Sequence, residues 1–520
     1  MDSTSTPLSW YCVVLASIAA LLFYWFLLCN GWRRKKTKTA LPPGPPGWPI
    51  VGNLFQLGKK PNESLCALSL QYGPLMTLSL GMKTVVVVSS PAMAKEVFKT
   101  HDQILAGRTV IEATKILSHH KSSLIWAEHG PRWRKLRRIA TTELFSHDRL
   151  QGLQHLRQDQ TFRTIRLIFE DNGKVVNIGH TTFCTSLNLL GNMIFSTDVF
   201  DPHNPASAEF KDTVWRLMKL GGMANLADFF PFLGFLDPQG VCRQSTKYTR
   251  RMYDFVDTFI EKRLASRCES PEQTGAKKDF LDVLLDFRSE DFTLEDVRAL
   301  IAELFLAGTE TTTTTIEWAV AELFHNPQKM ERVRGELDEV VGCNRRVEES
   351  DLEHLLYIRA VVKEIFRLHP TAPLLLPHKA QSSCEVAGFL IPKNSQVIAN
   401  VWAIGRDPAI WKEPSTFKPE RFLEGENRNV EYRGQNFELI PFGAGRRICP
   451  GLPLASLMVH LVLASLLHSF EWTHPDGKSW EEMDMSDEFA LTLKKAIDLN
   501  AIPAPRLSHQ IYADNSRSRS

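Results

Sequence analysis

The chain has little net charge, and its cysteines are not paired along the sequence. Lysine and arginine exceed aspartate and glutamate by only two in 520 residues, so nothing predicts a nucleic-acid partner. The nine cysteines are dispersed and form no Cys-x-x-Cys pair, which argues against a disulfide framework and favours a reducing compartment. There is also no fixed-period repeat and no long low-complexity tract.

Residues 8–29 form a long run without a charged side chain. A helix of this length reaches roughly 33 Å, enough for a hydrocarbon core of about 30 Å. No lysine or arginine precedes the run, whereas a basic cluster begins at Arg33. The positive-inside rule then places the short N-terminus in the lumen and the rest of the chain in the cytosol. A cleaved signal peptide is the alternative, and the missing basic residues before the run argue against it.

The whole chain, including this anchor, is predicted to have four parts. They are an anchor at 1–30, a basic and proline-rich hinge at 31–50, a catalytic domain at 51–507 and a polar C-terminal tail at 508–520. Within the catalytic domain, the runs Leu-Met-Thr-Leu-Ser-Leu at 75–80 and Thr-Val-Val-Val-Val at 84–88, with a turn at Gly81 between them, predict two strands. Loops are predicted at 108–126, which shows no clear period, and at the polar stretch 266–278. Four phenylalanines surround Pro231. They could belong to the ordinary core or to a loop that dips into a bilayer.

A helix of 32 residues is predicted between Thr293, which opens a capping box with Asp296, and the stop at Asn326–Pro327. Its middle contains Gly308 and several threonines, which are poor helix formers. A local rule that is broken inside a long buried element indicates a functional site.

The segment 442–451 reads Phe-Gly-Ala-Gly-Arg-Arg-Ile-Cys-Pro-Gly and precedes an apolar helical run to Phe470. Arg446, Arg447 and the following helix N-terminus are expected to favour the thiolate of Cys449. One thiolate with no second cysteine nearby cannot close a zinc site, but it can hold one axial position of a haem iron. A buried structural cysteine in a glycine-rich turn is the alternative.

The spacing Phe-x-x-Gly-x-Arg-x-Cys-x-Gly resembles the haem-binding signature of the cytochromes P450, and the likeness extends over nearly the whole chain. The proline-rich stretch 41–49 is similar to the hinge of plant microsomal members. Among these the chain is most like terpenoid oxidases of the geraniol 8-hydroxylase type, and next like alkaloid oxidases of the N-methylcoclaurine 3'-hydroxylase type. The resemblance implies a mainly α fold with a small β region behind one N-terminal transmembrane helix, and haem b (iron-protoporphyrin IX) as cofactor.

The resemblance also implies roles for particular residues. Cys449 would be the axial ligand of the haem iron, and Glu310 and Thr311 would support proton delivery to iron-bound dioxygen. The other cofactor-binding residues would be Trp133, Arg137, His378, Arg447 and Phe442. The triad that braces the cysteine loop would be Glu364, Arg367 and Arg421. The substrate pocket would include Ala307, Thr371, Leu374, Leu375 and Ala490.

The function implied is a monooxygenase in the endoplasmic reticulum membrane, with its catalytic domain in the cytosol. It would take electrons from NADPH through NADPH-cytochrome P450 reductase and use O2 to oxidise a small lipophilic plant metabolite, a terpenoid before an alkaloid or a phenolic. Two alternatives belong to other classes: a haem-thiolate isomerase or dehydratase, and a haem sensor or carrier. Glu310 and Thr311 argue against the isomerase, because that chemistry needs no proton relay. The anchor and the apolar pocket argue against the sensor.

Overall fold

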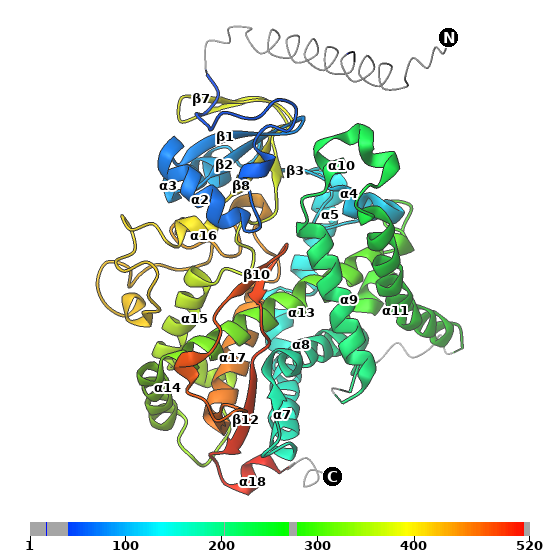
Figure 1. Cartoon of the computed structure of the whole chain (residues 1–520). Helices are drawn as coiled ribbons and strands as arrows, with labels where there is room; N and C mark the ends of the chain where they lie inside the picture. The colour runs from blue at the N-terminus through cyan, green and yellow to red at the C-terminus, as the bar shows by residue number, and fades with distance from the viewer. Residues whose placement is uncertain (1–16, 18–39, 202, 270–277, 514–520) are drawn as a thin grey trace, which may run out of the picture.

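The computed structural model describes Ser17 and residues 40–201, 203–269 and 278–513. The predicted anchor lies outside these residues, except for Ser17. Among the described cysteines every thiol is free, as the sequence predicts. Helices dominate, and a small sheet occupies one end of the molecule (Figure 1).

The helices enclose the core and account for most of the described chain. The α-helices are α2 (Pro61–Tyr72), α3 (Pro91–Lys95), α4 (Glu112–Lys115), α5 (Pro131–Glu143), α6 (His147–Gly152), α7 (Gln154–Glu170), α8 (Ile178–Phe195), α9 (Pro205–Gly222), α10 (Leu226–Phe229), α11 (Val241–Glu269), α12 (Phe280–Asp286), α13 (Leu294–His325), α14 (Pro327–Val340), α15 (Leu356–Leu368), α16 (Val401–Ile404), α17 (Leu452–Ser469) and α18 (His509–Tyr512). Short helical turns are η1 (Leu54–Gln56), η2 (Glu96–Thr100), η3 (Ile116–Lys121), η4 (Pro231–Leu236), η5 (Glu349–Glu353), η6 (Pro419–Phe422), η7 (Gly445–Arg447) and η8 (Trp480–Glu482).

The strands form one larger sheet and three small ones. They are β1 (Leu75–Leu80), β2 (Lys83–Val88), β3 (Gly107–Arg108), β4 (Val176–Asn177), β5 (His378–Lys379), β6 (Cys384–Val386), β7 (Phe389–Ile391), β8 (Gln396–Ala399), β9 (Phe470–Thr473), β10 (Asp487–Phe489), β11 (Leu493–Lys495) and β12 (Asn500–Pro505). The larger sheet has the order β1-β2-β8-β5-β3. In it β1 and β2 form a hairpin, and β2 runs parallel to β8. The other sheets are β4-β12-β9, β6-β7 and β10-β11.

The long helix α13 crosses the middle of the helical body, with α8 and α17 packed against it (Figure 1). It spans 32 residues and its capping box of Thr293 and Asp296 is present, so both predicted ends are confirmed. Within the described residues, α17 is the helix that is long and apolar enough to cross a membrane, but 78% of it is buried inside the protein. Helix α17 is therefore part of the core.

The proline-rich stretch is held against the sheet. Thr77 N donates to Pro43 O at 2.8 Å, and Asn53 Nδ2 donates to Pro45 O at 3.2 Å. A side chain at Gly44 would place its Cβ 1.9 Å from Thr77 O, so only glycine permits this approach. The part of the hinge that is described, 40–50, thus packs on the domain that it precedes.

Three predicted loops differ from the structure. The segment 108–126 contains α4 and η3, although its sequence has no helical period. Helix α11 continues past residue 266 to Glu269, so the predicted loop 266–278 begins too early. The phenylalanine-rich loop forms α10 and η4, in which Phe230 is buried and Phe235 is 84% exposed. One loop thus contributes both to the core and to the surface.

The predicted polar tail, 508–520, begins with a short helix in the part that the structure describes. Helix α18 ends at Tyr512, whose ring stacks on Phe169 at 4.3 Å between centroids. The Tyr512 hydroxyl donates to Ser469 O at the end of α17, and the side chain is 2% exposed. One buried aromatic side chain binds this short helix to the core. The residues around it are polar, so the sequence does not indicate this contact.

Candidate active site

One cavity brings together the cysteine loop and the middle of α13. Its wall includes Cys449, Phe442 and Arg447 from the loop, and Ala307 and Thr311 from α13. Trp133 and Arg137 of α5 and His378 of β5 lie on the same wall. Residues that are far apart in the sequence, and that sequence reasoning assigns to a cofactor or to oxygen chemistry, therefore surround one space.

The cysteine loop is held in a conformation that requires glycine. Cys449 N donates to Phe442 O at 2.9 Å, and Gly443 and Gly445 have φ of 71° and 68°. A Cβ on Gly445 would lie 2.2 Å from Phe98 O. The loop therefore turns through left-handed backbone and packs directly against η2, and Cys449 faces the cavity.

Arg446 and Arg447 precede Cys449 closely in the sequence, but their guanidinium groups bind elsewhere and do not stabilise its sulfur. Arg446 pairs with Asp102 at 3.2 Å, and Arg447 donates to Ala106 O and Ala127 O. The predicted stabilisation by these two arginines is therefore wrong. Burial raises the pKa of the Cys449 thiol, while the backbone N–H groups of Gly451 and Leu452 and the charge of Arg137 lower it only in part. A thiolate here needs a further positive partner, which a metal ion supplies.

Arg108, Arg137 and Arg447 lie on the cavity wall, and no acidic side chain of that wall forms an ion pair with them. Arg108 of β3 is 5% exposed and donates to Leu376 O at 2.7 Å and to Ile125 O at 3.3 Å. Burial, with the nearby charge of Arg447, lowers the pKa of Arg108. Arg137 Nη1 donates to Ile448 O at 2.6 Å. Such a concentration of positive charge fits an anionic ligand in the cavity.

Arg447 provides the sharpest observation in this group. Its guanidinium lies 4.1 Å from the ring centroid of Trp133, and its Nη1 is buried with no hydrogen-bond partner among the described residues. The Trp133 indole N–H donates to Leu124 O at 3.0 Å. The free donor in this pair is thus on Arg447, whereas Trp133 supplies the surface on which the guanidinium packs.

His378 lies beside these arginines on β5. Its Nδ1–H donates to Leu105 O at 2.7 Å, and burial holds the pKa of the imidazole well below its usual value. In this neutral tautomer Nε2 carries no proton and can only accept. His378 therefore has no N–H left for a ligand, whereas the neighbouring Arg108 brings a guanidinium group to the same wall. Sequence reasoning missed Arg108, whose only signal is an arginine that follows the apolar run 104–106 after one glycine.

Three threonines of α13, Thr309, Thr311 and Thr315, turn their hydroxyls back onto carbonyl groups of the helix. Thr311 Oγ1 donates to Ala307 O at 2.6 Å, which leaves its oxygen free to accept from the cavity side. Glu310 lies off the cavity wall. Its carboxyl is buried, its Oε2 has no partner among the described residues, and burial raises its pKa. The helix thus carries a hydroxyl at the cavity and a carboxyl of raised proton affinity next to it in sequence.

The five predicted pocket residues divide into two groups. Ala307, Thr371 and Leu375 line the cavity. Leu374 instead packs against the apolar cluster that β1 and β2 form with Leu65 and Ile398. Ala490 is buried beside Gly222 of α9 and does not reach the cavity.

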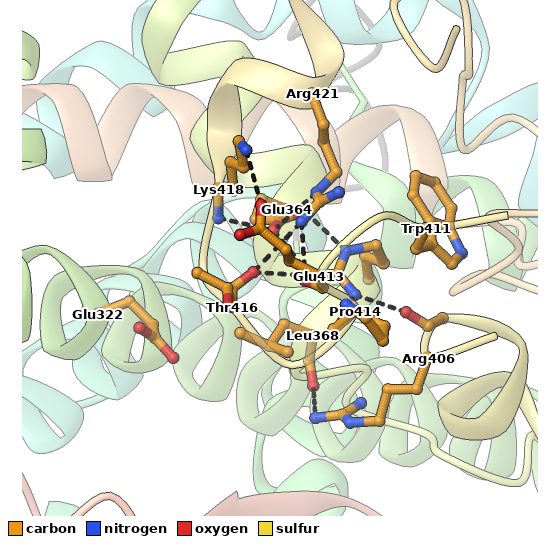
Figure 2. A network of polar contacts seen from close by, with 12 residues as sticks. Glu322, Glu364, Leu368, Arg406, Trp411, Glu413, Pro414, Thr416, Lys418 and Arg421 are labelled. Carbon is orange, nitrogen blue, oxygen red and sulfur yellow. Dashed lines mark hydrogen bonds and ion pairs between the residues drawn. The ribbon is translucent and has the colours of Figure 1, made fainter. Parts of the chain in front are cut away.

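A buried ion network braces the segment before the cysteine loop (Figure 2). Glu364 and Arg367 of α15 have no exposed side-chain surface, and Arg421 of η6 has 5%. Glu364 accepts from Arg367 at 2.7 Å through both carboxylate oxygens, and from Arg421 Nε at 3.1 Å. The remaining guanidinium N–H groups donate to the chain between 405 and 416, at Gly405 O, Lys412 O, Glu413 O, Pro414 O and Thr416 O. The three predicted residues thus meet and fasten an irregular segment to a helix.

A mainly helical fold thus places a cysteine loop, a cluster of arginines and the threonine-rich part of one long helix around a single cavity. The family model described as cytochrome P450 matches residues 42–499, and the chain belongs to the cytochrome P450 family. The family implies haem as cofactor, and the protein is a monooxygenase that uses O2, a redox partner and a lipophilic substrate.

The chain is similar to several plant enzymes over almost its full length. It is 45% identical to cytochrome P450 76T24 of Catharanthus roseus, over 94% of this chain and 99% of the relative. It is 44% identical to geraniol 8-hydroxylase of Swertia mussotii, over 91% and 94%. It is 43% identical to the probable (S)-N-methylcoclaurine 3'-hydroxylase isozyme 2 of Coptis japonica, over 96% and 99%. Plant members of the family are typically membrane-bound.

Proposed function

We propose that this chain oxidises a small lipophilic plant metabolite, a terpenoid before an alkaloid or phenolic, with Cys449 as the axial ligand of haem iron. The observation that carries the proposal is that one cavity is lined both by Cys449 and by the threonine-rich middle of α13. A soft sulfur donor faces the cavity, and the unpartnered Nη1 of Arg447 offers a donor for an anionic group. The residues present therefore fit a haem with its two carboxylates.

When bound, haem b activates O2 with electrons that originate from NADPH and arrive through NADPH-cytochrome P450 reductase. Arg108, Arg137 and Arg447 would hold the carboxylates, and Phe442 would pack against the cofactor. Thr311 Oγ1, whose own proton is donated to Ala307 O, would accept a hydrogen bond at the cavity and orient the donor there, and Glu310 would supply protons through water. The raised pKa of Glu310 suits that role, because a donor must hold its proton near neutral pH.

The cavity wall above the cysteine loop favours an apolar substrate. It is formed mainly by leucines of α8 and α13, which are Leu189, Leu190, Leu300 and Leu304, together with Leu375 and Ile125. Such a wall excludes water and binds hydrocarbon through its area. The geraniol 8-hydroxylases among the relatives therefore indicate the substrate class before the methylcoclaurine hydroxylase does.

The test is turnover with defined substrates. Membranes that contain the full chain and a plant reductase are incubated with geraniol and with (S)-N-methylcoclaurine, with and without NADPH, and products are measured by mass spectrometry. An oxygenated product from geraniol that requires NADPH supports the proposal. An oxygenated product from the methylcoclaurine alone would assign the alkaloid alternative. Rearrangement of a fatty-acid hydroperoxide without NADPH would assign the isomerase.

The membrane anchor belongs to the same proposal. Residues 8–29 would cross the endoplasmic reticulum membrane once, residues 31–50 would form the hinge, and the catalytic domain would lie in the cytosol. Every residue assigned to the site follows the hinge, so deletion of residues 1–30 should leave a domain that still binds haem. Full-length and truncated chains are compared for membrane fractionation and for the haem absorption band. A truncated domain that is soluble but free of haem would contradict the proposed boundary.

A further inference from the structure

Glu303 is a buried carboxylate that the reaction described above does not use. It lies on α13 two turns before Thr311, and only 3% of its surface is exposed. It contributes to the wall of the active-site cavity, which is otherwise mostly apolar near α8 and α13. A buried carboxylate in such surroundings requires partners that satisfy its oxygens.

All partners of Glu303 come from one loop, residues 119–125. Oε1 accepts from Ser123 Oγ and from His119 Nε2, the latter at 3.1 Å. Oε2 accepts from the backbone N–H groups of Leu124 and Ile125, at 2.7 and 3.3 Å. A carboxylate accepts about four hydrogen bonds, so Glu303 has no capacity left for a substrate. Its contacts fasten the loop to α13.

The same contacts reach a third element, α11. The Tyr253 hydroxyl lies 2.7 Å from His119 Nδ1. Burial, and to a lesser extent the charge of Glu303, raise the pKa of Tyr253, so its phenol stays protonated and donates to Nδ1. Nε2 of His119 then carries the proton that is donated to Glu303. The chain of hydrogen bonds connects α11, the loop and α13.

This loop separates two cavities. The second cavity lies between α9, α11 and α13 and is lined mainly by apolar residues, including Leu217, Met218, Met252 and Leu306. Glu303 and Ile125 belong to the walls of both cavities. Just before the loop, Leu117 and Ser118 have φ of 49° and 57°. Left-handed backbone at two side-chain-bearing residues is strained, and contacts elsewhere must hold it.

We propose that Glu303 is a positioning residue that fastens loop 119–125 between the two cavities and thereby limits the size of molecule that passes from the second cavity to the active site. It acts through hydrogen bonds to the loop, and its charge as such is not required. Glutamine can keep an acceptor for the N–H groups of Leu124 and Ile125. The Ser123 hydroxyl and the other tautomer of His119, whose Nε2 is an acceptor, can then accept from the new amide. Alanine keeps none of these bonds.

The first measurement is hydrogen–deuterium exchange of the backbone amides of 123–125 in the full chain. Glu303→Ala should increase exchange of these amides about tenfold, because the bonds to a charged acceptor are lost. Glu303→Gln should stay within about threefold of the wild type, since its acceptor remains. The control is Glu317→Gln, a buried carboxylate on the same helix that accepts from Leu499 N at 2.9 Å and contacts no part of the loop. It should leave exchange at 123–125 unchanged, and equal effects of Ala and Gln at 303 would overturn the proposal.

The second measurement rests on the proposed function, because it uses haem as the reporter. Association of imidazole and of the much larger clotrimazole is followed by the shift of the Soret band after rapid mixing. Glu303→Ala should speed association of clotrimazole about tenfold and leave imidazole unchanged, since only the large probe needs the loop to open. Equal acceleration of both probes would overturn the size limit. A wild-type chain that binds neither azole would refute the haem assignment, while the exchange measurement would still decide the role of Glu303. If Glu303→Ala does not fold, Ser123→Ala is the second variant, because it removes the bonds of this hydroxyl to Glu303 and to Trp126 N without a change of charge. It should increase exchange and clotrimazole association in the same direction, and no change would count against the proposal.

Discussion

Removal of Glu364 should destabilise the protein strongly and cause loss of haem. In the wild type this carboxylate neutralises two guanidinium groups that are almost completely buried. Glu364→Ala would leave both positive charges in the core with only carbonyl partners. Breaking a buried pair in this way costs about 3–5 kcal/mol, whereas an exposed pair costs about 1 kcal/mol or less.

The effect should extend beyond α15. Arg367 donates to Gly405 O and Pro414 O at 2.6 Å each, and Lys418 N donates to Glu364 Oε1 at 2.8 Å. The segment 405–418 contains few regular elements of its own, so these bonds determine its path. Arg367→Lys should also destabilise by about 2 kcal/mol or more, because an ammonium group cannot reproduce the planar bidentate contact with Glu364.

The assay is urea unfolding followed by tryptophan fluorescence, together with haem content per chain from the pyridine haemochrome spectrum. Glu424→Ala is a matched control, because Glu424 is exposed near the same segment and its loss should change stability by no more than about 0.5 kcal/mol. A value for Glu364→Ala within 1 kcal/mol of this control, with normal haem content, would refute the argument from buried charge.

Three further results are expected. Cys449→Ser should abolish the carbon-monoxide difference band that is typical of thiolate ligation, and retention of that band would reassign the ligand. Thr311→Ala should bind substrate normally but form about 10²–10⁴-fold less product, with peroxide released as NADPH is consumed, and an unchanged ratio of product to NADPH would place the proton donor elsewhere. Burial lowers the pKa of His460 to about 4, from about 6.5 in an unfolded chain, so the unfolded state binds more protons between these values and stability is lost as pH falls through that window. His460→Gln should remove about 3 kcal/mol of the loss of stability between pH 7 and pH 4, and parallel pH curves for variant and wild type would contradict this.

The sequence predicts the ends of a helix correctly where they are determined by residues close by in the chain. The capping box at Thr293 and the stop at Asn326–Pro327 lie within one turn of the ends of α13, which is why both predicted ends are correct. The loop 119–125 has no such signal. Its path depends on Glu303, about 180 residues further along the chain, and no local pattern reports such a contact.

In the candidate site, too, local features are predicted by the sequence and long-range contacts are not. The glycine spacing around Cys449 predicts a tight turn, and the structure has one because Gly443 and Gly445 both use left-handed backbone. The partners of the arginines are not predicted by position, since a long side chain reaches whatever carbonyl lies near it in space. Arg446 and Arg447 are adjacent in sequence, yet one binds Asp102 at the surface and the other turns into the cavity wall.

The sheets join segments that a ribosome produces at very different times. Val85 of β2 pairs with Gln396 of β8, and Asn177 of β4 pairs with Asn500 of β12. At about 5–20 residues per second, each early strand waits roughly a quarter of a minute to a minute for its partner. During that interval β2 and β4 present open edges that other chains can pair with. A premature stop a few codons before Asn500 would remove β12 and leave the edges of β4 and β9 without their partner.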